Sequence, residues 1–292
     1  MFIELLTSKT SLCYNELVNK IKQYKMFLLN GVLKVTTVCI INKKGGVAKT
    51  TTSLALGAGL RKKGYSVLYI DLDSQCNLSM CVGADVDGKN VLGVLTEQLS
   101  IDEAIQTTAL GDILPAGLAL AGADGVIVET GKEYRLREAI NSMKVMYDFI
   151  VIDTPPSLGV LSINAMTASD WLIIPAQADM FSRDGLIQLD RAIRKDKQYC
   201  NPSLRIAGIL LTRYSERNIL SKNLKEIFID LAEKMDTSVF QSSIREGIAL
   251  KEAQVMHQSI FDYAPKSNGA EDYAKFVDEF LRTIDRKTGA RG

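Results

Sequence analysis

The sequence predicts an α/β fold in which a doubly wound, mostly parallel β-sheet is flanked by helices. Three observations lead to this fold class. Short apolar runs rich in β-branched residues alternate with longer segments of helical periodicity. These runs are nearly continuous rather than alternating in polarity, as expected for strands of a parallel sheet that is covered on both faces. The first run leads directly into a glycine-containing turn, at the strand end where such sheets bind ligands.

Five apolar runs are predicted to be buried strands. In chain order they are Val35–Ile41, Val67–Leu72, Phe149–Ile152, Trp171–Ile174 and Ile206–Leu211. Five other segments carry apolar residues at three- and four-residue spacing, which predicts helices. They are Thr51–Lys63, Glu133–Met146, Asp184–Gln198, Arg217–Lys234 and Ala270–Arg286. Their alternation implies right-handed crossover connections between parallel strands.

Composition narrows the class of protein. Apolar residues make up 47% of the 292 residues and charged residues 24%, which is ordinary for a globular protein. The formal net charge is +1, so any basic surface for nucleic acid must be a local patch. The five cysteines form no CxxC pair and His257 is the only histidine, so zinc or iron–sulfur binding is not expected. No apolar run reaches the roughly 18 residues of a membrane span, and a cytoplasmic location is predicted.

The loop after the first strand carries residues suited to binding phosphate. Residues 40–53 read IINKKGGVAKTTTS, so a buried strand is followed by glycines, a lysine, threonines and a helix. Glycines let backbone amides approach phosphate oxygens, and the start of the helix adds amide donors and the positive end of its dipole. Lys49 can then reach the β- and γ-phosphates, and the Thr50 hydroxyl can ligand Mg²⁺.

The loop departs from the standard GxxxxGK[ST] pattern, because Lys43 and Ala48 stand at its two glycine positions. It resembles instead the deviant P-loop, KGGxxK[ST], of the ParA/MinD family of ATPases. Two more segments fit this resemblance. YIDLDSQCN at residues 69–77 is similar to the family's DxDPQGN, and FIVIDTPP at residues 149–156 places Asp153 at the Walker B position. The similarity is greatest to the ParA/Soj partition branch.

The resemblance implies which residues bind nucleotide. They would be Lys44, Gly45, Gly46, Val47, Ala48, Lys49, Thr50 and Thr51, with Arg213 and Pro265 near the adenine. In the family, ATP lies between two subunits of a homodimer. By this resemblance Lys44 would reach across to the partner's phosphates, while Lys49 would bind those of its own subunit. The resemblance implies ATP rather than GTP, and no guanine-reading NKxD pattern is evident at a strand end.

The resemblance also implies catalytic and metal-binding roles. Lys44, Lys49 and Asp73 would be the catalytic residues, with Asp73 positioning or activating the attacking water. Thr50 would ligand Mg²⁺, and Asp153 would hold the metal through its water shell. A supporting role is expected for Asp71, because strand alternation places it away from the side of Asp73.

The function implied by the resemblance is that of a ParA-like partition ATPase. Its ATP-bound dimer would bind non-specific DNA at the nucleoid, and a ParB-like partner would stimulate an otherwise slow hydrolysis to segregate DNA. Candidate DNA contacts are Arg213, Arg217, Lys222, Arg245 and Lys251. Ala249 stands where members of the family often carry a DNA-contacting arginine, so either Arg245 substitutes for it or DNA binding is weak.

Related ATPases suggest other functions. A MinD-like or cargo-positioning ATPase would cycle on a membrane or another surface without binding DNA. Acidic residues such as Asp278 and Glu279 make the last predicted helix a poor membrane anchor, so no membrane partner is expected. A reductase or chaperone of this type needs cysteines paired across a dimer, and a tyrosine kinase needs a tyrosine-rich tail. The sequence offers neither feature.

The chain is expected to consist of one large domain with short additions at both ends. Residues 1–33 are predicted to be an N-terminal extension, either disordered or containing a short helix at Tyr14–Met26. They are too few for a helix-turn-helix domain. Residues 34–286 are predicted to be the P-loop ATPase domain, and residues 287–292 a basic tail. Gly83–Gly131, rich in Gly, Ala and Asp, is expected to be a variable surface element.

Overall fold

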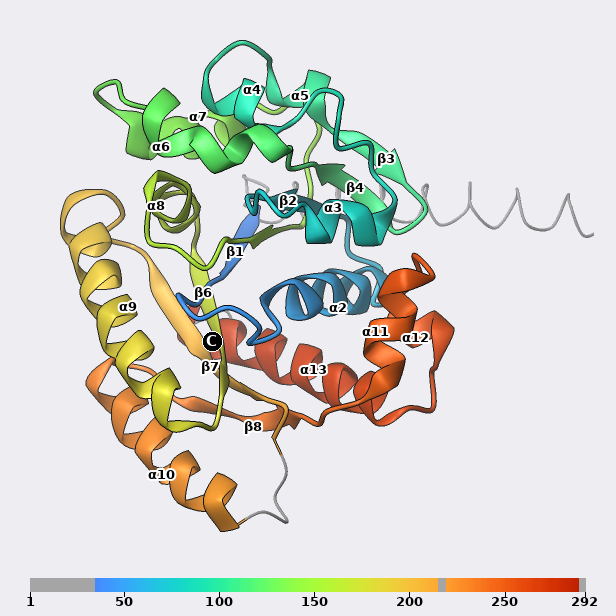
Figure 1. Ribbon diagram of the computed structural model, residues 1–292, viewed down its shortest axis with the longest axis vertical. Helices are drawn as coiled ribbons and strands as arrows, with labels where there is room; N and C mark the ends of the chain where they lie inside the picture. Colours follow the sequence, from blue (N-terminus) through green and yellow to red (C-terminus); the bar gives the residue numbers. More distant parts are fainter. Residues whose placement is uncertain (1–34, 215–218, 289–292) are drawn as a thin grey trace, which may run out of the picture.

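An eight-stranded sheet runs through the centre of the molecule in the order β3-β4-β2-β5-β1-β6-β7-β8. The computed structural model describes residues 35–214 and 219–288, without the side chains of residues 180, 181 and 219–224 (Figure 1). Neighbouring strands are parallel, except that β3 and β4 are antiparallel. The predicted fold class, a doubly wound and mostly parallel sheet, is confirmed.

The five predicted strands are the five inner strands of this sheet. In spatial order they are β2 Val67–Asp71, β5 Phe149–Asp153, β1 Thr36–Ile40, β6 Trp171–Gln177 and β7 Arg205–Thr212. Successive side chains enter opposite cores: Val38 and Ile40 pack into one, and Cys39 into the other. Because both faces of these strands are buried, they appear in the sequence as continuous apolar runs.

Three outer strands were not predicted from the sequence. They are β3 Gln106–Thr108, β4 Gly111–Leu114 and β8 Val239–Ile244. β3 is short and polar, and only two of the six residues of β8 are buried, so neither presents an apolar run. The register of β7 and β8 shifts between Ile209 and Leu211. The amides of Gln241 and Ser242 donate instead to the carboxylate of Glu279.

Helices cover both faces of the sheet (Figure 1). One core joins the sheet to α2 Lys49–Lys62, α3 Asn77–Val82, α11 Ile248–Val255, α12 Ile260–Tyr263 and α13 Asn268–Thr288. The other core joins it to α4 Val91–Leu95, α5 Ile101–Ala104, α6 Ala123–Val126, α7 Arg135–Asn141, α8 Val160–Thr167, α9 Met180–Tyr199 and α10 Ile219–Lys234. Two short 3₁₀ turns, η1 Leu118–Gly122 and η2 Lys132–Tyr134, lie among the latter.

Two sequence-based expectations need correction here. The helix predicted over Glu133–Met146 is shorter, since α7 ends at Asn141 and Ser142 is its C-cap, with an amide that donates to the carbonyls of Glu138 and Ala139. The segment Gly83–Gly131 is more than a surface element. It adds β3 and β4 to the sheet and buries apolar side chains in the core, including Val91, Ile101, Ile113 and Leu114.

The predicted ends of the chain are only partly described. The predicted extension over residues 1–33, including the helix at Tyr14–Met26, lies outside the described residues. At the other end, Lys287 and Thr288 of the predicted basic tail belong to α13, and residues 289–292 are not described. The ammonium of Lys287 donates to the carbonyl of Ile206 at 2.8 Å, so this lysine is engaged with the sheet.

Candidate functional site

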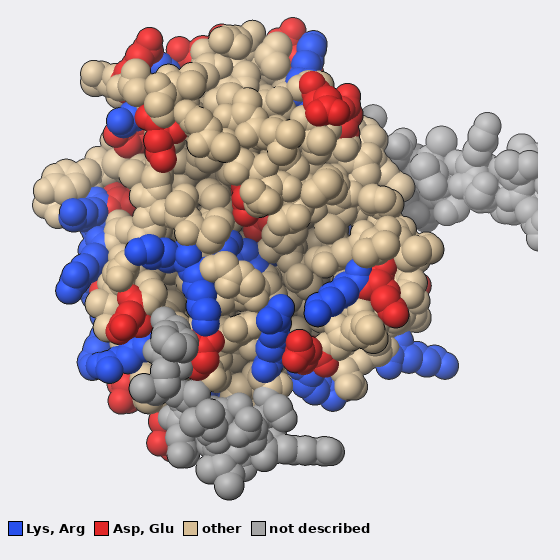
Figure 2. Space-filling view, in the orientation of Figure 1, with Lys and Arg blue, Asp and Glu red and all other residues tan. Residues whose placement is uncertain are grey.

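A cavity of about 420 Å³ opens where the carboxyl ends of several parallel strands meet. It is lined by the segments that follow β1, β2, β5, β7 and β8, and by side chains of α11 and α13. Such a volume suits a small-molecule ligand. In Figure 2, most of the Lys and Arg side chains of this face lie in the lower half, over α9 and around the central hollow. The cavity therefore has the position and size expected for a ligand site of a doubly wound sheet.

The loop between β1 and α2 forms one wall of the cavity. Gly46 has φ 74° and Ala48 has φ 67°, both in the left-handed region. The turn at Ala48 starts α2, a 14-residue helix whose first amides receive no side-chain cap. Uncapped amides at the positive end of a helix dipole form an anion site. Gly45, Gly46, Ala48, Lys49, Thr50 and Thr51 all line the cavity.

Lys49 and Asp153 meet at the base of the loop. Lys49 is only 7% exposed, and its ammonium donates to the carbonyl of Lys44 at 3.2 Å. Burial lowers the pKa of Lys49, against the opposing effect of Asp153 and Asp73. Asp153 accepts hydrogen bonds from Thr50 Oγ1 at 2.6 Å and from Ser53 Oγ at 3.1 Å. Hydroxyl and carboxylate oxygens are ligands that Mg²⁺ prefers, so this donor set fits the ion.

A second pair of carboxylates follows β2. Asp71 is fully buried and lies opposite Asp153 in the register of β2 and β5. It accepts hydrogen bonds from the Ser79 amide and hydroxyl and from the Asp73 amide. Burial raises the pKa of Asp71 to about 6, and burial followed by the charge of Asp71 raises that of Asp153 to about 7. Asp73 lines the cavity, whereas Asp71 holds the turn that places it.

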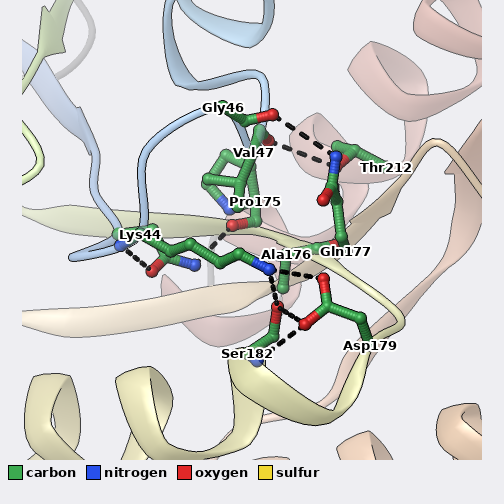
Figure 3. Close-up of polar contacts among 10 residues, drawn as sticks. Lys44, Gly46, Val47, Pro175, Ala176, Gln177, Asp179, Ser182 and Thr212 are labelled. Atoms are coloured by element: carbon green, nitrogen blue, oxygen red, sulfur yellow. Dashed lines mark hydrogen bonds and ion pairs between the residues drawn. The ribbon is translucent and has the colours of Figure 1, made fainter.

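The P-loop is tied to the ends of β6 and β7 (Figure 3). Thr212 Oγ1 donates to the carbonyl of Val47 at 3.1 Å, and Asn42 Nδ2 donates to the carbonyl of Pro175 at 2.7 Å. The side chain of Val47 is fully buried and does not line the cavity. Lys44 does not line it either: its side chain runs away from the loop toward Asp179 at the start of α9 (Figure 3).

The more distant candidates divide into three groups. Arg213 and Lys251 line the cavity, but Pro265, which lies in the described chain between α12 and α13, does not. Arg245 also lines it, but its guanidinium is paired with Asp272 at 2.6 Å and Glu271 at 3.2 Å. Arg217 and the side chain of Lys222 lie outside the described part of the chain.

Several residues that line the cavity were not predicted as site residues, although Gln75 and Asn77 lie in the segment similar to DxDPQGN. Gln75, Asn77, Gln254 and Tyr273 line the cavity, and Gln254 Nε2 donates to Thr51 Oγ1 at 3.1 Å. Gln254 and Tyr273 come from α11 and α13, far along the chain from the loop. Ser53 does not line the cavity, but its hydroxyl donates to Asp153. It lies one helical turn after Lys49, so it faces the same side of α2 and could have been inferred from that spacing.

The fold and the site together define a P-loop nucleotide-binding ATPase. A family model described as an AAA domain matches residues 35–206. The chain is 38% identical to the sporulation initiation inhibitor protein Soj of Bacillus subtilis, over 83% of this chain and 96% of that protein. It is 35% identical to the chromosome partitioning protein ParA of Caulobacter vibrioides, over 87% and 97%. The chain belongs to the ParA/Soj partition branch of the ParA/MinD-type P-loop ATPases.

Solved structures agree with this assignment. A cobyrinic acid a,c-diamide synthase of Mycobacterium smegmatis with bound ADP and magnesium has a TM-score of 0.75 and 33% identity, over 88% of this chain and 97% of that one. A putative plasmid partition protein of Borrelia burgdorferi bound to AMPPNP has a TM-score of 0.72 and 27% identity, over 87% and 100%. ATP and Mg²⁺ are the cofactors, and nucleotide hydrolysis is the general reaction of this family.

Proposed function

We propose that this protein is a partition ATPase that dimerises around ATP, binds non-specific DNA in that state and releases it on hydrolysis. The proposal rests on the different positions of two lysines of one loop relative to the cavity. Lys49 lines the cavity of its own subunit, and Lys44 lies outside it. A lysine of the phosphate-binding loop that does not serve its own cavity is suited to serve the cavity of a second copy.

The proposed roles at the reacting centre follow from position. Lys49 binds the phosphates of its own subunit, with the backbone amides of the loop and the start of α2. Thr51 lies beside the phosphate-binding helix start and holds the α-phosphate. Asp73 faces the cavity as the group that orients the attacking water. Thr50 and Asp153 would hold the Mg²⁺ ion, which neutralises phosphate charge when bound.

The proposed DNA contact uses the basic residues at the cavity rim. Arg213 and Lys251 are the described candidates whose side chains lie there. The charge of Arg245 is shared with Asp272 and Glu271, so its contribution to phosphate binding is smaller. We place the protein at the nucleoid in the cytoplasm, with residues 34–286 as the ATPase domain and a ParB-like activator of its slow hydrolysis.

The membrane-cycling alternative lacks a suitable helix in the described chain. In α13, Phe276, Val277 and Phe280 are fully buried against the sheet, so they are not available to enter lipid. Among the described residues no helix combines the length and apolar character needed to cross a membrane. A cargo-positioning role without DNA remains the second candidate.

The decisive experiment is binding to random duplex DNA with Mg-ATP, with Mg-ADP and without nucleotide, across a salt series. Binding that requires ATP and weakens steeply with salt is expected, because non-specific affinity comes from phosphate contacts. Absence of binding in every nucleotide state would contradict the DNA-tethered cycle and favour the cargo-positioning alternative. Loss of DNA binding in an Arg213→Ala, Lys251→Ala double variant that still binds Mg-ATP as the unsubstituted protein does would assign the surface, and the ATP control is needed because both residues line the cavity.

A further inference from the structure

Lys44 makes its ionic contact inside its own subunit. Its ammonium lies 2.5 Å from Asp179 Oδ2 and 3.4 Å from Ser182 Oγ, at the first turn of α9 (Figure 3). The two side chains of the pair are 29% and 32% exposed. A partly solvated pair of this kind is worth little free energy, so it can be exchanged for another partner.

Asp179 uses its two carboxylate oxygens for different purposes. Oδ1 accepts hydrogen bonds from the amide and hydroxyl of Ser182 at 2.9 and 3.1 Å, which caps the start of α9. Oδ2 takes the ammonium of Lys44. Burial raises the pKa of Asp179, but the contacts with Lys44 and Ser182 outweigh burial and lower it. The cap and the ion pair therefore depend on the same carboxylate, and only the ion pair needs its charge.

The neighbouring ties of the loop do not depend on Lys44. The carbonyl of Val47 accepts a hydrogen bond from Thr212, and Asn42 of the loop donates to the carbonyl of Pro175; both side chains are neutral. These bonds hold the loop at the ends of β6 and β7 (Figure 3). A lysine has a long flexible stem, so its ammonium can leave Asp179 while the loop backbone stays in place.

We propose that Asp179 is a positioning residue that holds Lys44 within its own subunit, and that ATP-driven dimerisation exchanges this carboxylate for a nucleotide phosphate of the partner. The inference rests on the proposed ATP-bound dimer. Dimerisation then includes the cost of breaking the Lys44–Asp179 pair. Removing the charge of Asp179, while keeping its cap, releases Lys44 and favours the dimer.

The first test measures whether Asp179 restrains Lys44. In nucleotide-free protein, Asp179→Asn should increase acylation of Lys44 by an amine-reactive reagent by about 2- to 5-fold, as followed by mass spectrometry. Asparagine caps helices as well as aspartate does, so α9 should keep its start. The matched control is Asp278→Asn, which frees Lys63 from a pair of the same 2.5 Å length. It should increase labelling of Lys63 and leave Lys44 unchanged.

The second test measures whether that restraint matters for association. With Mg-ATP, sedimentation should show half-maximal dimerisation of Asp179→Asn at about 2- to 5-fold lower concentration than the unsubstituted protein at low salt. The difference should shrink as salt screens the pair. Asp278→Asn should associate as the unsubstituted protein does. Asp179→Ser, which also caps without a charge, replaces Asp179→Asn if that variant does not fold.

Three outcomes would overturn the proposal in distinguishable ways. Equal labelling of Lys44 with and without the Asp179 charge would show that no restraint exists. Increased labelling with unchanged or weaker association would remove the positioning role. If the unsubstituted protein does not associate with ATP at all, the proposed dimer fails and the exchange fails with it, while the labelling result still decides whether Asp179 holds Lys44.

Discussion

Lys49 is a buried cation surrounded by carboxylates. It is 7% exposed, and burial lowers its pKa while Asp153 and Asp73 oppose that effect. A charged group this deeply placed is tolerated only when it has partners. In the proposed site these partners include the phosphates of ATP, which makes Lys49 the residue whose loss should weaken nucleotide binding most.

Lys49→Ala should reduce ATP affinity by roughly 30- to 5,000-fold, since losing one partner of a buried charged contact costs about 2–5 kcal/mol. Titration calorimetry with Mg-ATP would measure the change. Lys43→Ala is the matched control, because Lys43 belongs to the same loop but is exposed and contacts Gln188 rather than lining the cavity. Normal ATP affinity in Lys49→Ala would contradict the assignment of this loop as the phosphate-binding site.

Asp196 on α9 is a buried carboxylate that the site does not use. Its Oδ1 accepts a hydrogen bond from Thr167, but its Oδ2 has no partner in the described chain. Burial raises the pKa of Asp196 to about 6, against the opposing effects of Thr167 and Arg137. The folded state thus binds a proton more tightly than the unfolded chain, so this group lowers stability as pH rises from about 4 to about 6.

Asp196→Asn should raise the free energy of unfolding at pH 7.5 by about 1–3 kcal/mol, because the amide carries no charge to bury. The gain should fall as pH drops from about 6 and approach zero only below about pH 3, where the aspartate is protonated in both states. Urea denaturation at several pH values would measure it. Asp190→Asn, on the same helix but in a more exposed pair with Arg194, should show little change. A gain that does not depend on pH would contradict the role of the buried charge.

At the scale of elements, α2 lies unusually close to β2. A Cβ at Gly57 would be 2.2 Å from Tyr69 Cε1. Tyr69 is fully buried, and its hydroxyl donates to the carbonyl of Leu54, so the ring has no room to move aside. The glycine therefore sets the distance between the helix that begins the P-loop site and the strand that leads to Asp73.

Gly57→Ala should destabilise the fold by about 1–3 kcal/mol, the usual cost of overpacking, even though alanine favours helix formation. The midpoint of denaturant unfolding would show it. Gly125→Ala is the control, since Gly125 lies in α6 with open space around its Cα. An unchanged midpoint for Gly57→Ala would mean that α2 can shift away from β2 without cost.

The strands that could be predicted are those whose burial on both faces requires an apolar sequence. β1, β2, β5, β6 and β7 are covered on both faces, so each is an apolar run. β3 and β8 at the edges are half exposed, and their sequences QTT and VFQSSI show no such run. The same holds at the site. The loop and Asp153 can be recognised from the local sequence, whereas Gln254 and Tyr273 are brought to the cavity from distant elements by tertiary packing alone.

At the scale of the whole molecule, the proposed cycle requires hydrolysis to limit the lifetime of the dimer. Asp73→Ala should retain ATP binding, lower phosphate release by about 100-fold or more as expected for loss of a general base, and accumulate an ATP-bound dimer. Phosphate-release assays and sedimentation would follow both effects. Asp87→Ala, an exposed residue of the same region, serves as the control. Unchanged turnover would remove Asp73 from the reaction.

The burial of α2 has a consequence for where the molecule can move. Nine of its 14 residues are buried between the sheet and α13, from Lys49 to Leu60. Amide hydrogens in such an element exchange with solvent only when large parts of the protein unfold. Deuterium uptake by α2 should therefore be among the slowest in the chain, with or without nucleotide, and the first turn of α9 should respond instead. The phosphate-binding helix α2 is then expected to stay in place during the nucleotide cycle, while the surrounding segments, such as the first turn of α9, move.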